Sequence, residues 1–420
     1  MTAASQRETC VVGLGYVGLP LAIALTEAGE QVIGFDVDAG KVDALRAGHS
    51  RIEDITDERL AAAVAAGLRL TSLPTEIKAA TNYVICVPTP LRDGLPDLGA
   101  VQAAGAIVGG ALEPGDLVVL ESTTYPGTTE DVLRPLLEDT SGLVAHRDFD
   151  LAYSPERIDP GNETWTLHTT PKVVGGTTER ATARAAELYG RVATQIVHAS
   201  GPRAAEMAKL LENTFRHVNI ALVNELTVYA HALGIDIWEV IRLAGTKPFG
   251  FMPFYPGPGV GGHCIPVDPS YLSWAVRKHG FQFRFVELAQ EVNERMPTYV
   301  VSRITELLNE RGLAVSRSRI LCVGVAYKPD VSDCRESPSL QVLRKLLALQ
   351  ADVDYLDPHV PEVTLEGRKL QSVESPDGPY DLAVVLTAHR AIDLDAVAAA
   401  SAVVFDTRNA APGEANVVRL

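Results

Sequence analysis

The segment from Thr9 to Asp36 places the strongest limit on how this chain can fold. It reads TCVVGLGYVGLPLAIALTEAGEQVIGFD, an apolar strand pattern that runs into Gly13-x-Gly15-x-x-Gly18, then a helix pattern, a second strand and an acid. Glycines at these spacings allow a tight turn, close approach to a pyrophosphate and packing of the helix against the strand. Free N–H groups at the helix N-terminus suit phosphate oxygens. The segment therefore predicts a dinucleotide-binding βαβ unit.

Asp36 indicates which dinucleotide the unit prefers. It follows the second strand, where an acidic side chain accepts a hydrogen bond from a ribose 2′-hydroxyl. A GxGxxG motif alone is a weak signal, but here the strand, helix, second strand and acid occur in the required order. We therefore predict that the unit binds NAD rather than NADP.

Two further apolar strands end in small polar residues. They lie in the runs NYVICVPTP (82–90) and DLVVLEST (116–123). Because ligands bind beyond the carboxyl ends of parallel strands, we expect Thr89, Ser122 and Thr123 at the mouth of the cofactor crevice. Ordinary strand-ending turns are the alternative interpretation of these three residues.

A third strand lies in DFDLAYSPERIDPGN (148–162) and breaks at Pro155. The break delivers Glu156 and Arg157 to the same edge of the sheet. A carboxylate in this place suits a general base, with Arg157 balancing its charge. An exposed pair in a surface loop is the alternative, and the spacing alone does not decide between them.

A long helical pattern without Pro or Gly runs from Arg203 to Leu233. Its length predicts a spine that joins domains or forms a dimer interface. Lys209 and Asn213 are four residues apart and share one face of this helix. Apolar neighbours leave two interpretations of that face: a pair that looks into a site, or an ordinary solvated surface.

The loop Phe254–Asp268, FYPGPGVGGHCIPVD, packs four Gly and three Pro around Cys264. A segment with so many Gly and Pro residues cannot continue a helix or a central strand. The backbone at its glycines can approach a ligand closely, because no side chain intervenes. A thiol in such a loop is a candidate nucleophile. A turn that contains a small apolar residue is the alternative, because reactive cysteines are recognised by their surroundings.

An α/β rhythm without the glycine motif resumes in the last third of the chain. Strand patterns occupy 319–327, 351–358, 380–389 and 401–409. Lys328, Arg335 and Arg408 are cations close to the strand ends, where they suit a phosphate-bearing ligand. Solvated surface charge is the alternative.

Composition limits the partners and the compartment. A net charge of −16 over 420 residues argues against nucleic acid and anionic membranes as partners. No apolar run is long enough to span a membrane, and MTAASQRETC lacks a signal-peptide pattern, so we expect a cytoplasmic protein.

The other cysteines carry no predicted chemistry. None of the five lies in a CxxC or a zinc-like spacing, so we predict neither a disulfide framework nor a metal site. Cys10, Cys86 and Cys322 lie inside apolar runs and are predicted to be buried strand residues. Cys334 lies among charged residues and is predicted to be exposed.

Together these patterns predict an α/β protein with two Rossmann-like doubly wound domains, joined by a long central helix in a helical middle domain. A thiol beside NAD suggests aldehyde oxidation, in which the Cys264 thiolate adds to the carbonyl, hydride leaves to nicotinamide and a thioester is hydrolysed. Lys209 would favour the thiolate and stabilise the oxyanions. Glu156 would activate the water, held by Thr123.

The residues also carry a family resemblance. The runs GLGYVGLP, VPTP, EST, SPER, AKLLENTFR, GPGVGGHCIPVDP and YKPDVSDCRESP look like those of the UDP-glucose/GDP-mannose dehydrogenase family, occur in its order and cover nearly the whole chain. The resemblance implies an NAD-binding domain (1–200), a central helical dimerisation domain with the cysteine loop (201–300) and a nucleotide-sugar-binding domain (301–420). It also implies a homodimer that oxidises a nucleotide-sugar C6 alcohol to a carboxylate in two NAD-dependent steps, for polysaccharide synthesis.

The resemblance implies roles for individual positions. Cys264 matches the nucleophile, Lys209 and Asn213 the pair that positions oxyanion and water, Asp268 the aspartate that assists them, Glu156 the glutamate of thioester hydrolysis, and Thr123 the threonine near the catalytic water. The matching cofactor positions are Gly13, Gly15, Tyr16, Val17, Gly18, Asp36, Lys41, Thr89, Thr123 and Arg335. The matching substrate positions are Glu156, Arg157, Lys209, Asn213, Tyr255, Gly261, Lys328 and Arg408.

Departures from the glucose-type pattern bear on the substrate. This chain has SPER (154–157) where glucose-type members carry NPEF, and Pro266-Val267-Asp268 where they carry Pro-Lys-Asp. The combination is more similar to members that act on UDP-N-acetylhexosamines, especially UDP-N-acetylglucosamine. The mannosamine and galactosamine epimers, UDP-glucose and a dTDP-sugar stay open as alternatives.

Two rival classes stay open as well. A two-electron dehydrogenase of the β-hydroxyacid type resembles the N-terminal half, but needs neither Cys264 nor a second nucleotide-binding half. A non-catalytic sensor of nucleotide sugar or NAD would be marked by loss of Cys264, Lys209 or Asp268, and all three are present. The yield of NADH per sugar separates the classes: two, one or none.

Overall fold

The structure is a computed structural model that describes residues 8–50, 52, 54–92, 94–158, 162, 164–262 and 265–420. The chain forms two compact units. The first combines Met1–Glu212 with Ser270–Phe281, and the second combines Asn213–Pro269 with Gln282–Leu420. We call them the first and second units.

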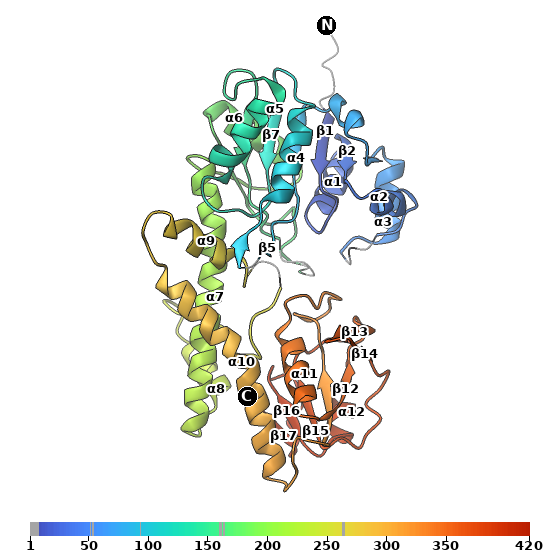
Figure 1. Ribbon diagram of the computed structural model, residues 1–420, viewed down its shortest axis with the longest axis vertical. Coiled ribbons are helices and arrows are strands. Elements are labelled where there is room, and N and C mark those ends of the chain that lie inside the picture. The colour runs from blue at the N-terminus through green and yellow to red at the C-terminus, as the bar shows by residue number, and fades with distance from the viewer. Residues whose placement is uncertain are drawn as a thin grey trace. The chain divides into compact units, whose positions relative to one another are not determined.

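The first unit is built on an eight-stranded sheet with the order β10-β9-β8-β7-β4-β1-β2-β3 (Figure 1). Neighbouring strands are parallel except for β8 and β9. The strand order reverses between β1 and β4, which is where a doubly wound sheet binds its ligand. The strands are β1 (Glu8–Val12), β2 (Gln31–Phe35), β3 (Arg69–Thr71), β4 (Asn82–Ile85), β7 (Leu117–Leu120), β8 (Asp150–Tyr153), β9 (Lys172–Gly176) and β10 (Ile196–His198); a separate hairpin pairs β5 (Leu91–Arg92) with β6 (Leu95–Pro96).

Helices cover both faces of this sheet, because its strands are apolar on both sides. Val11 of β1 joins a core that includes residues of α1, whereas Cys10 and Val12 join a core that includes residues of α4. This alternation is the period-two geometry of a strand buried on both faces. The helices are α1 (Gly18–Glu27), α2 (Ala39–Arg46), α3 (Asp57–Ala65), α4 (Gly99–Gly109), α5 (Arg134–Ser141) and α6 (Glu179–Tyr189), with a 3₁₀ turn η1 (Pro74–Ala79) and a π turn η2 (Thr128–Leu133).

The predicted long helix is present as α7 (Pro202–Ala232). Its residues up to Glu212 belong to the first unit and the following ones to the second. Glu206 is fully buried and anchors α7 to η2, because its carboxylate accepts hydrogen bonds from the Gly127 and Thr129 N–H groups and the Thr129 hydroxyl. The next three helices along the chain are α8 (Ile237–Ala244), α9 (Asp268–Arg277) and α10 (Arg284–Asn309).

The second unit contains a five-stranded parallel sheet with the order β12-β11-β15-β16-β17 (Figure 1). Ile320 and Cys322 of β11 face a core shared with α10 and α11, and Leu321 and Val323 face a core shared with α12. Two doubly wound sheets were predicted, and this is confirmed. The elements are β11 (Arg319–Val323), α11 (Pro338–Ala348), β12 (Asp352–Leu356), β13 (Glu362–Leu365), β14 (Arg368–Gln371), β15 (Leu382–Val385), α12 (Leu394–Ala399), β16 (Val404–Asp406) and β17 (Val417–Arg419).

The cysteine predictions need one correction. Cys10 and Cys322 are buried in strands, and Cys86 is buried directly after β4. Cys334 is half-buried rather than exposed, because it packs against the apolar core under the second sheet. Charged neighbours in sequence therefore misled the prediction for this residue.

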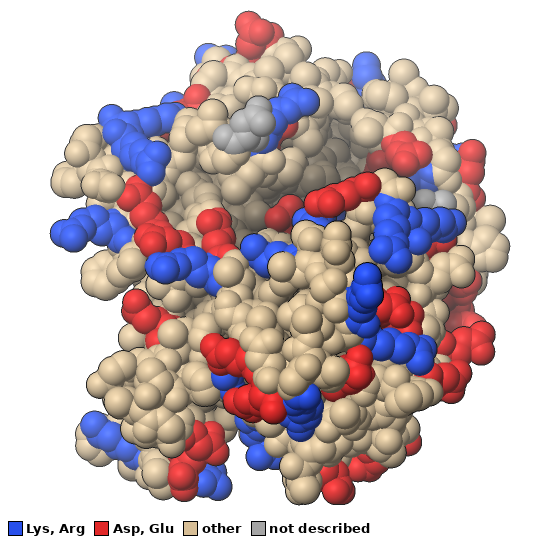
Figure 2. All heavy atoms as spheres, turned by 60° about the horizontal axis from the view of Figure 1, so that its bottom comes forward, with Lys and Arg blue, Asp and Glu red and all other residues tan. Residues whose placement is uncertain are grey.

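Charge is distributed without one dominant basic area on the face shown in Figure 2, where Lys and Arg are interspersed with Asp and Glu. Among the helices of the described ranges, none combines the length and apolar character needed to cross a bilayer.

Gly324 tests the packing of the second sheet. It follows β11 with φ of 79°, and a Cβ there would lie 2.1 Å from the Thr387 carbonyl oxygen. Gly367 has φ of 81° but open space around it, so it is a matched control for backbone strain. We expect Gly324→Ala to lower the free energy of unfolding by about 1–3 kcal/mol more than Gly367→Ala does, measured by urea unfolding. Equal effects would contradict the packing argument.

Candidate active site

The glycine-rich turn after β1 forms a cradle at the point where the strand order reverses. Gly13 has φ of 95°, and a Cβ there would lie 2.6 Å from the Cys86 carbonyl oxygen after β4. A Cβ on Gly18 would lie 1.9 Å from the Gly13 carbonyl oxygen, whereas one on Gly15 would meet nothing within 4 Å. The bare backbone therefore closes the turn and leaves room at Gly15, which fits a pyrophosphate on the N-terminus of α1.

Asp36 lies beside this cradle at the end of β2. Its Oδ2 accepts hydrogen bonds from the Leu14 N–H group at 2.9 Å and from the Lys41 ammonium at 2.7 Å. Its Oδ1 accepts one from the Asp38 N–H group at 3.0 Å. The carboxylate is thus buried and oriented on the turn, in the position that suits a ribose hydroxyl.

The remaining predicted cofactor residues of the first unit lie around the same strand ends. Tyr16 is exposed and Val17 half-buried at the start of α1. The Thr89 carbonyl oxygen accepts a hydrogen bond from the Tyr271 hydroxyl at 3.0 Å. Thr123 is half-buried after β7, next to Ser122, whose hydroxyl donates to the Val87 carbonyl oxygen at 2.7 Å.

Glu156 is held firmly at the end of β8. Its Oε1 accepts hydrogen bonds from the backbone N–H groups of Arg157 at 2.7 Å and Ile158 at 2.6 Å. Its Oε2 lies 3.2 Å from the Lys172 ammonium. Burial alone raises the pKa of Glu156, but Lys172, a hydrogen bond with Glu121, the Ile158 N–H group and the charge of Lys209 together lower it below its usual range. The carboxylate is therefore ionised in the neutral range.

The guanidinium of Arg157 has partners other than the Glu156 carboxylate. Its guanidinium forms an ion pair with Glu212 at 2.7 Å and donates to the Pro171 carbonyl oxygen at 2.7 Å.

Lys209 of α7 is buried within the first unit. The sequence predictions gave no role to Lys172 and Glu121, which are buried partners of Glu156. The signals in the sequence were a lysine at the head of the apolar run PKVVGG and the glutamate of the run EST.

Asn213 and Asp268 are joined in the second unit. Both are buried, and the Asn213 side-chain amide donates a hydrogen bond to the Asp268 carboxylate. The predicted nucleophile, Cys264, lies outside the described residues.

The rest of the cysteine loop packs on the strand ends of the second sheet. A Cβ on Gly257 would lie 2.5 Å from Nη1 of Arg408, and one on Gly261 would lie 2.9 Å from Cβ of Tyr327. Arg408 donates through Nε to the Leu386 carbonyl oxygen at 2.7 Å, and burial lowers its pKa to about 10. The loop backbone and a strand-end cation therefore lie together, as a phosphate-bearing ligand requires.

Three other predicted residues lie in the second unit. Tyr255 stacks on Trp238 with ring centroids 6.1 Å apart, and Lys328 is half-buried after β11. Arg335 forms an ion pair with Asp333 at 2.8 Å.

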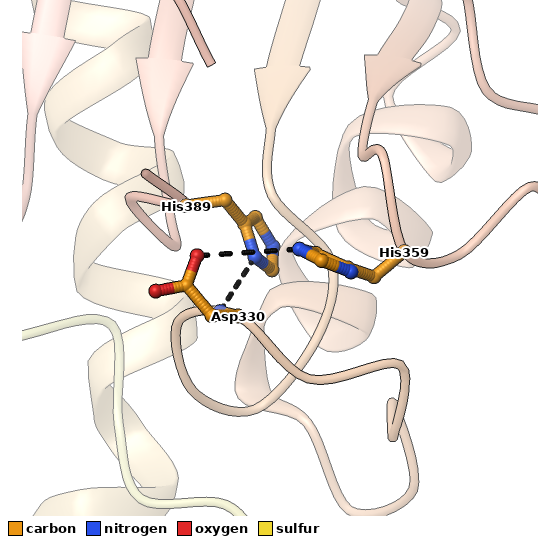
Figure 3. Close-up of side chains that lie close together, drawn as sticks. All are labelled: Asp330, His359 and His389. Carbon is orange, nitrogen blue, oxygen red and sulfur yellow. Dashed lines mark hydrogen bonds and ion pairs between the residues drawn. The ribbon is translucent and has the colours of Figure 1, made fainter. Parts of the chain in front are cut away.

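Asp330, His359 and His389 form a separate cluster at the strand ends of the second sheet (Figure 3). His389 is buried; its Nδ1 accepts from the Asp330 N–H group at 2.9 Å and its Nε2 lies 3.0 Å from the Asp357 carboxylate. Asp330 itself accepts from Arg390 through both oxygens. Both ring nitrogens of His389 and both carboxylate oxygens of Asp330 therefore have hydrogen-bond or ion-pair partners. The cluster connects the loops that follow β11, β12 and β15.

The comparisons with known proteins agree with this arrangement. Models of the UDP-glucose/GDP-mannose dehydrogenase family match residues 7–193 (NAD binding domain), 203–295 (central domain) and 321–412 (UDP binding domain). The chain is 36% identical to a UDP-N-acetyl-D-glucosamine 6-dehydrogenase of Salmonella typhi over 100% of both chains, and 36% identical to one of Pseudomonas aeruginosa over 91% of this chain and 90% of that one. A solved UDP-D-ManNAc dehydrogenase of Pyrococcus horikoshii superposes with a TM-score of 0.89, at 32% identity and 98% coverage of each chain.

Asp36 tests the cofactor cradle. We expect Asp36→Asn to weaken NAD binding by roughly 10- to 150-fold, because a hydrogen bond to a charged group contributes about 1.5–3 kcal/mol. The variant should also raise the relative affinity for NADP, because it removes a negative charge. Kd values for both dinucleotides, from fluorescence titration, check this. Asp38→Asn, which changes the exposed acid that caps α2, is the control and should leave both affinities within about twofold. Unchanged NAD affinity in Asp36→Asn would contradict the assignment.

Proposed function

Because the chain belongs to the UDP-glucose/GDP-mannose dehydrogenase family, we propose that it oxidises the C6 hydroxymethyl group of UDP-N-acetylglucosamine to a carboxylate in two NAD-dependent steps. Membership makes the chain an oxidoreductase, an NAD-dependent nucleotide-sugar dehydrogenase. Its partner is a nucleotide sugar, since the UDP binding domain is present. The finer proposal concerns the sugar and the residues that act on it.

The anchored Glu156 carboxylate is the observation that carries the four-electron proposal. A two-electron alcohol dehydrogenase needs no base to hydrolyse an acyl intermediate. Here a carboxylate is held by two backbone N–H groups and a buried ammonium, on the strand edge that also carries Thr123. Such a group suits activation or orientation of a water molecule.

The proposed reaction assigns a role to each residue. When bound, NAD accepts the hydride in each oxidation. Cys264 adds through sulfur to the C6 aldehyde, and the thioester formed by the second oxidation loses the thiolate when water attacks. Lys209 and Asn213 stabilise the oxyanions, Asp268 orients Asn213, and Glu156 with Thr123 directs the water. Tyr255, Gly261, Lys328 and Arg408 hold the nucleotide, and Arg335 contacts the cofactor.

The choice of UDP-N-acetylglucosamine rests on relatives and motifs. Two of the similar proteins are described as UDP-N-acetyl-D-glucosamine 6-dehydrogenases, at 36% identity over most of the chain. Others at comparable identity are described as UDP-N-acetyl-D-mannosamine or NDP-N-acetyl-D-galactosaminuronic acid dehydrogenases. All of these names carry an acetamido sugar, which favours that class over UDP-glucose or a dTDP-sugar.

We also propose that the protein is a cytoplasmic homodimer. The described cysteines are free thiols, as in a reducing compartment. In the second unit, α7, α8 and the segment after them form an apolar groove lined by Leu222, Leu226, Val240, Phe251 and Met252, all of which are exposed. Apolar surface of this kind fits a second copy of the same long helix in a two-fold interface.

The substrate proposal predicts a stoichiometry. We expect two NADH per UDP-N-acetylglucosamine consumed, with slow turnover of UDP-glucose, UDP-N-acetylgalactosamine, UDP-N-acetylmannosamine and dTDP-glucose. NADH absorbance and chromatography of the product, with the sugars in parallel, measure this. Preference for another of these sugars would overturn the substrate, one NADH per sugar would overturn the four-electron reaction, and no turnover would favour a sensor.

Cys264→Ser is the control for the thioester. A serine hydroxyl stays protonated at neutral pH and is then a poor nucleophile, and an alkoxide is a poorer leaving group than a thiolate. The variant should therefore stall at the second oxidation or at a slowly hydrolysed ester. Full four-electron turnover by this variant would contradict covalent catalysis by Cys264.

The dimer proposal predicts that Leu222→Glu combined with Leu226→Glu yields a monomer. Both side chains are exposed within the chain, so folding should be retained while unpaired charges in a buried interface weaken association at least tenfold. Light scattering after size-exclusion chromatography measures the mass. Leu73→Glu, at an exposed leucine of the first unit, is the control; a double variant that stays dimeric would refute this interface.

A further inference from the structure

Lys172 is a buried cation that the proposed reaction has not used. It begins β9, which runs antiparallel to β8 and pairs Ala152 with Gly176. The same register, continued past the end of β8, places Lys172 opposite Glu156. The Lys172 side chain is 4% exposed and that of Glu156 is 12% exposed.

Glu121, directly after β7, completes the cluster. The Lys172 ammonium forms ion pairs with both carboxylates, with Glu121 through Oε1 and with Glu156 through Oε2 at 3.2 Å. Glu121 is fully buried, and its Oε2 accepts a hydrogen bond from the Tyr189 hydroxyl at 2.6 Å. Tyr189 of α6 thereby holds Glu121 in place, and Glu121 holds the ammonium together with Glu156.

Burying three ionisable groups is expensive, and stability alone does not account for them. Removing each ion from water costs several kcal/mol, and apolar side chains of similar volume in such places are often as stable. Burial raises the pKa of Glu121, even though Lys172 opposes this, whereas the pKa of Glu156 is lowered. The cluster thus separates two neighbouring carboxylates into one that holds a proton more readily and one that stays ionised.

We propose that Lys172, held by Glu121 and Tyr189, is a positioning residue that keeps the Glu156 carboxylate ionised and aimed at the reacting centre. This inference rests on the proposed role of Glu156 in hydrolysing the thioester. Lys172 does not touch the substrate; it acts through Glu156. Without the ammonium, Glu156 would lose both an ion pair that fixes its direction and a charge that lowers its pKa, so it would take up a proton at a higher pH than in the wild type.

Several titratable groups lie around Glu156 and contribute to the pH dependence of its charge. The titratable groups facing it are Lys172 of β9, Glu121 after β7 and Lys209 of α7, with Tyr189 of α6 and Cys86 after β4 behind Glu121. A carboxyl pKa that is lowered in the folded protein leaves the group ionised at neutral pH and protonated only in acid. Loss of the cation raises that pKa, so the acid limb of the activity profile must move toward higher pH.

The test is Lys172→Met, with two readouts. The acid limb of kcat for NADH release should move up by roughly 1–3 pH units, because an opposite charge at this distance lowers a carboxyl pKa by that amount. Infrared difference titration of the carboxyl stretch, assigned by subtracting Glu156→Gln, should show the same upward shift in the protein without substrate. If Lys172→Met does not fold, Lys172→Gln replaces it with the same expectation.

Arg184→Met is the matched control. Arg184 pairs at 2.9 Å with Asp150, a buried carboxylate at the opposite end of β8, so the variant also removes a cation from a buried acid of the first unit. Its acid limb should stay within about 0.3 pH units of the wild type.

The outcomes separate this inference from the proposed function. An unmoved infrared pKa of Glu156 in the lysine variants, or an equal shift in Arg184→Met, overturns the positioning role even if the wild type yields two NADH. If the wild type oxidises no sugar, the proposed function fails, while an upward infrared shift still supports the hold of Lys172 on Glu156.

Discussion

The shared edge at the carboxyl ends of parallel strands is the constraint on which the first unit depends. β1, β4, β7 and β8 all end there, because crossovers through helices return each strand in the same direction. Gly13, Asp36, Thr123 and Glu156 lie far apart in sequence and still gather at that edge. The helices contribute mainly by burying both faces of the sheet, which fixes the strand order and so the positions of the loops.

Gathering polar side chains at this edge leaves several charged groups buried. Glu121, Glu156 and Lys172 lose most of their hydration, and each is compensated by a specific ion pair or hydrogen bond rather than by solvent. Such compensation works only at short distances, so it also restricts where the side chains can move. A site that must direct water toward an acyl group benefits from carboxylate geometry that does not relax.

The second unit uses the same principle without the glycine motif. Its loops after β11, β15 and β16 meet at one edge, where the half-buried Arg408 donates to the Leu386 carbonyl oxygen and lies beside Gly257. The close approach at Gly257 explains the glycine at this position, because a Cβ there would collide with the guanidinium. The histidine cluster clasps neighbouring loops at that edge and so helps to hold their shape.

The sequence by itself determined the fold class, the cofactor cradle and the long helix, because these depend on local patterns: alternating apolar strands, the spacing of Gly13 and Gly18, and an uninterrupted helical run from Arg203. Only the tertiary structure decided which charges meet. Arg157, adjacent to Glu156, pairs with Glu212 instead, and the partner of Glu156 is Lys172 on an antiparallel strand that the pattern did not predict. Strand pairing and burial depend on residues far apart in the sequence. The identity of an ionisable residue therefore does not show whether its side chain is exposed to solvent or buried.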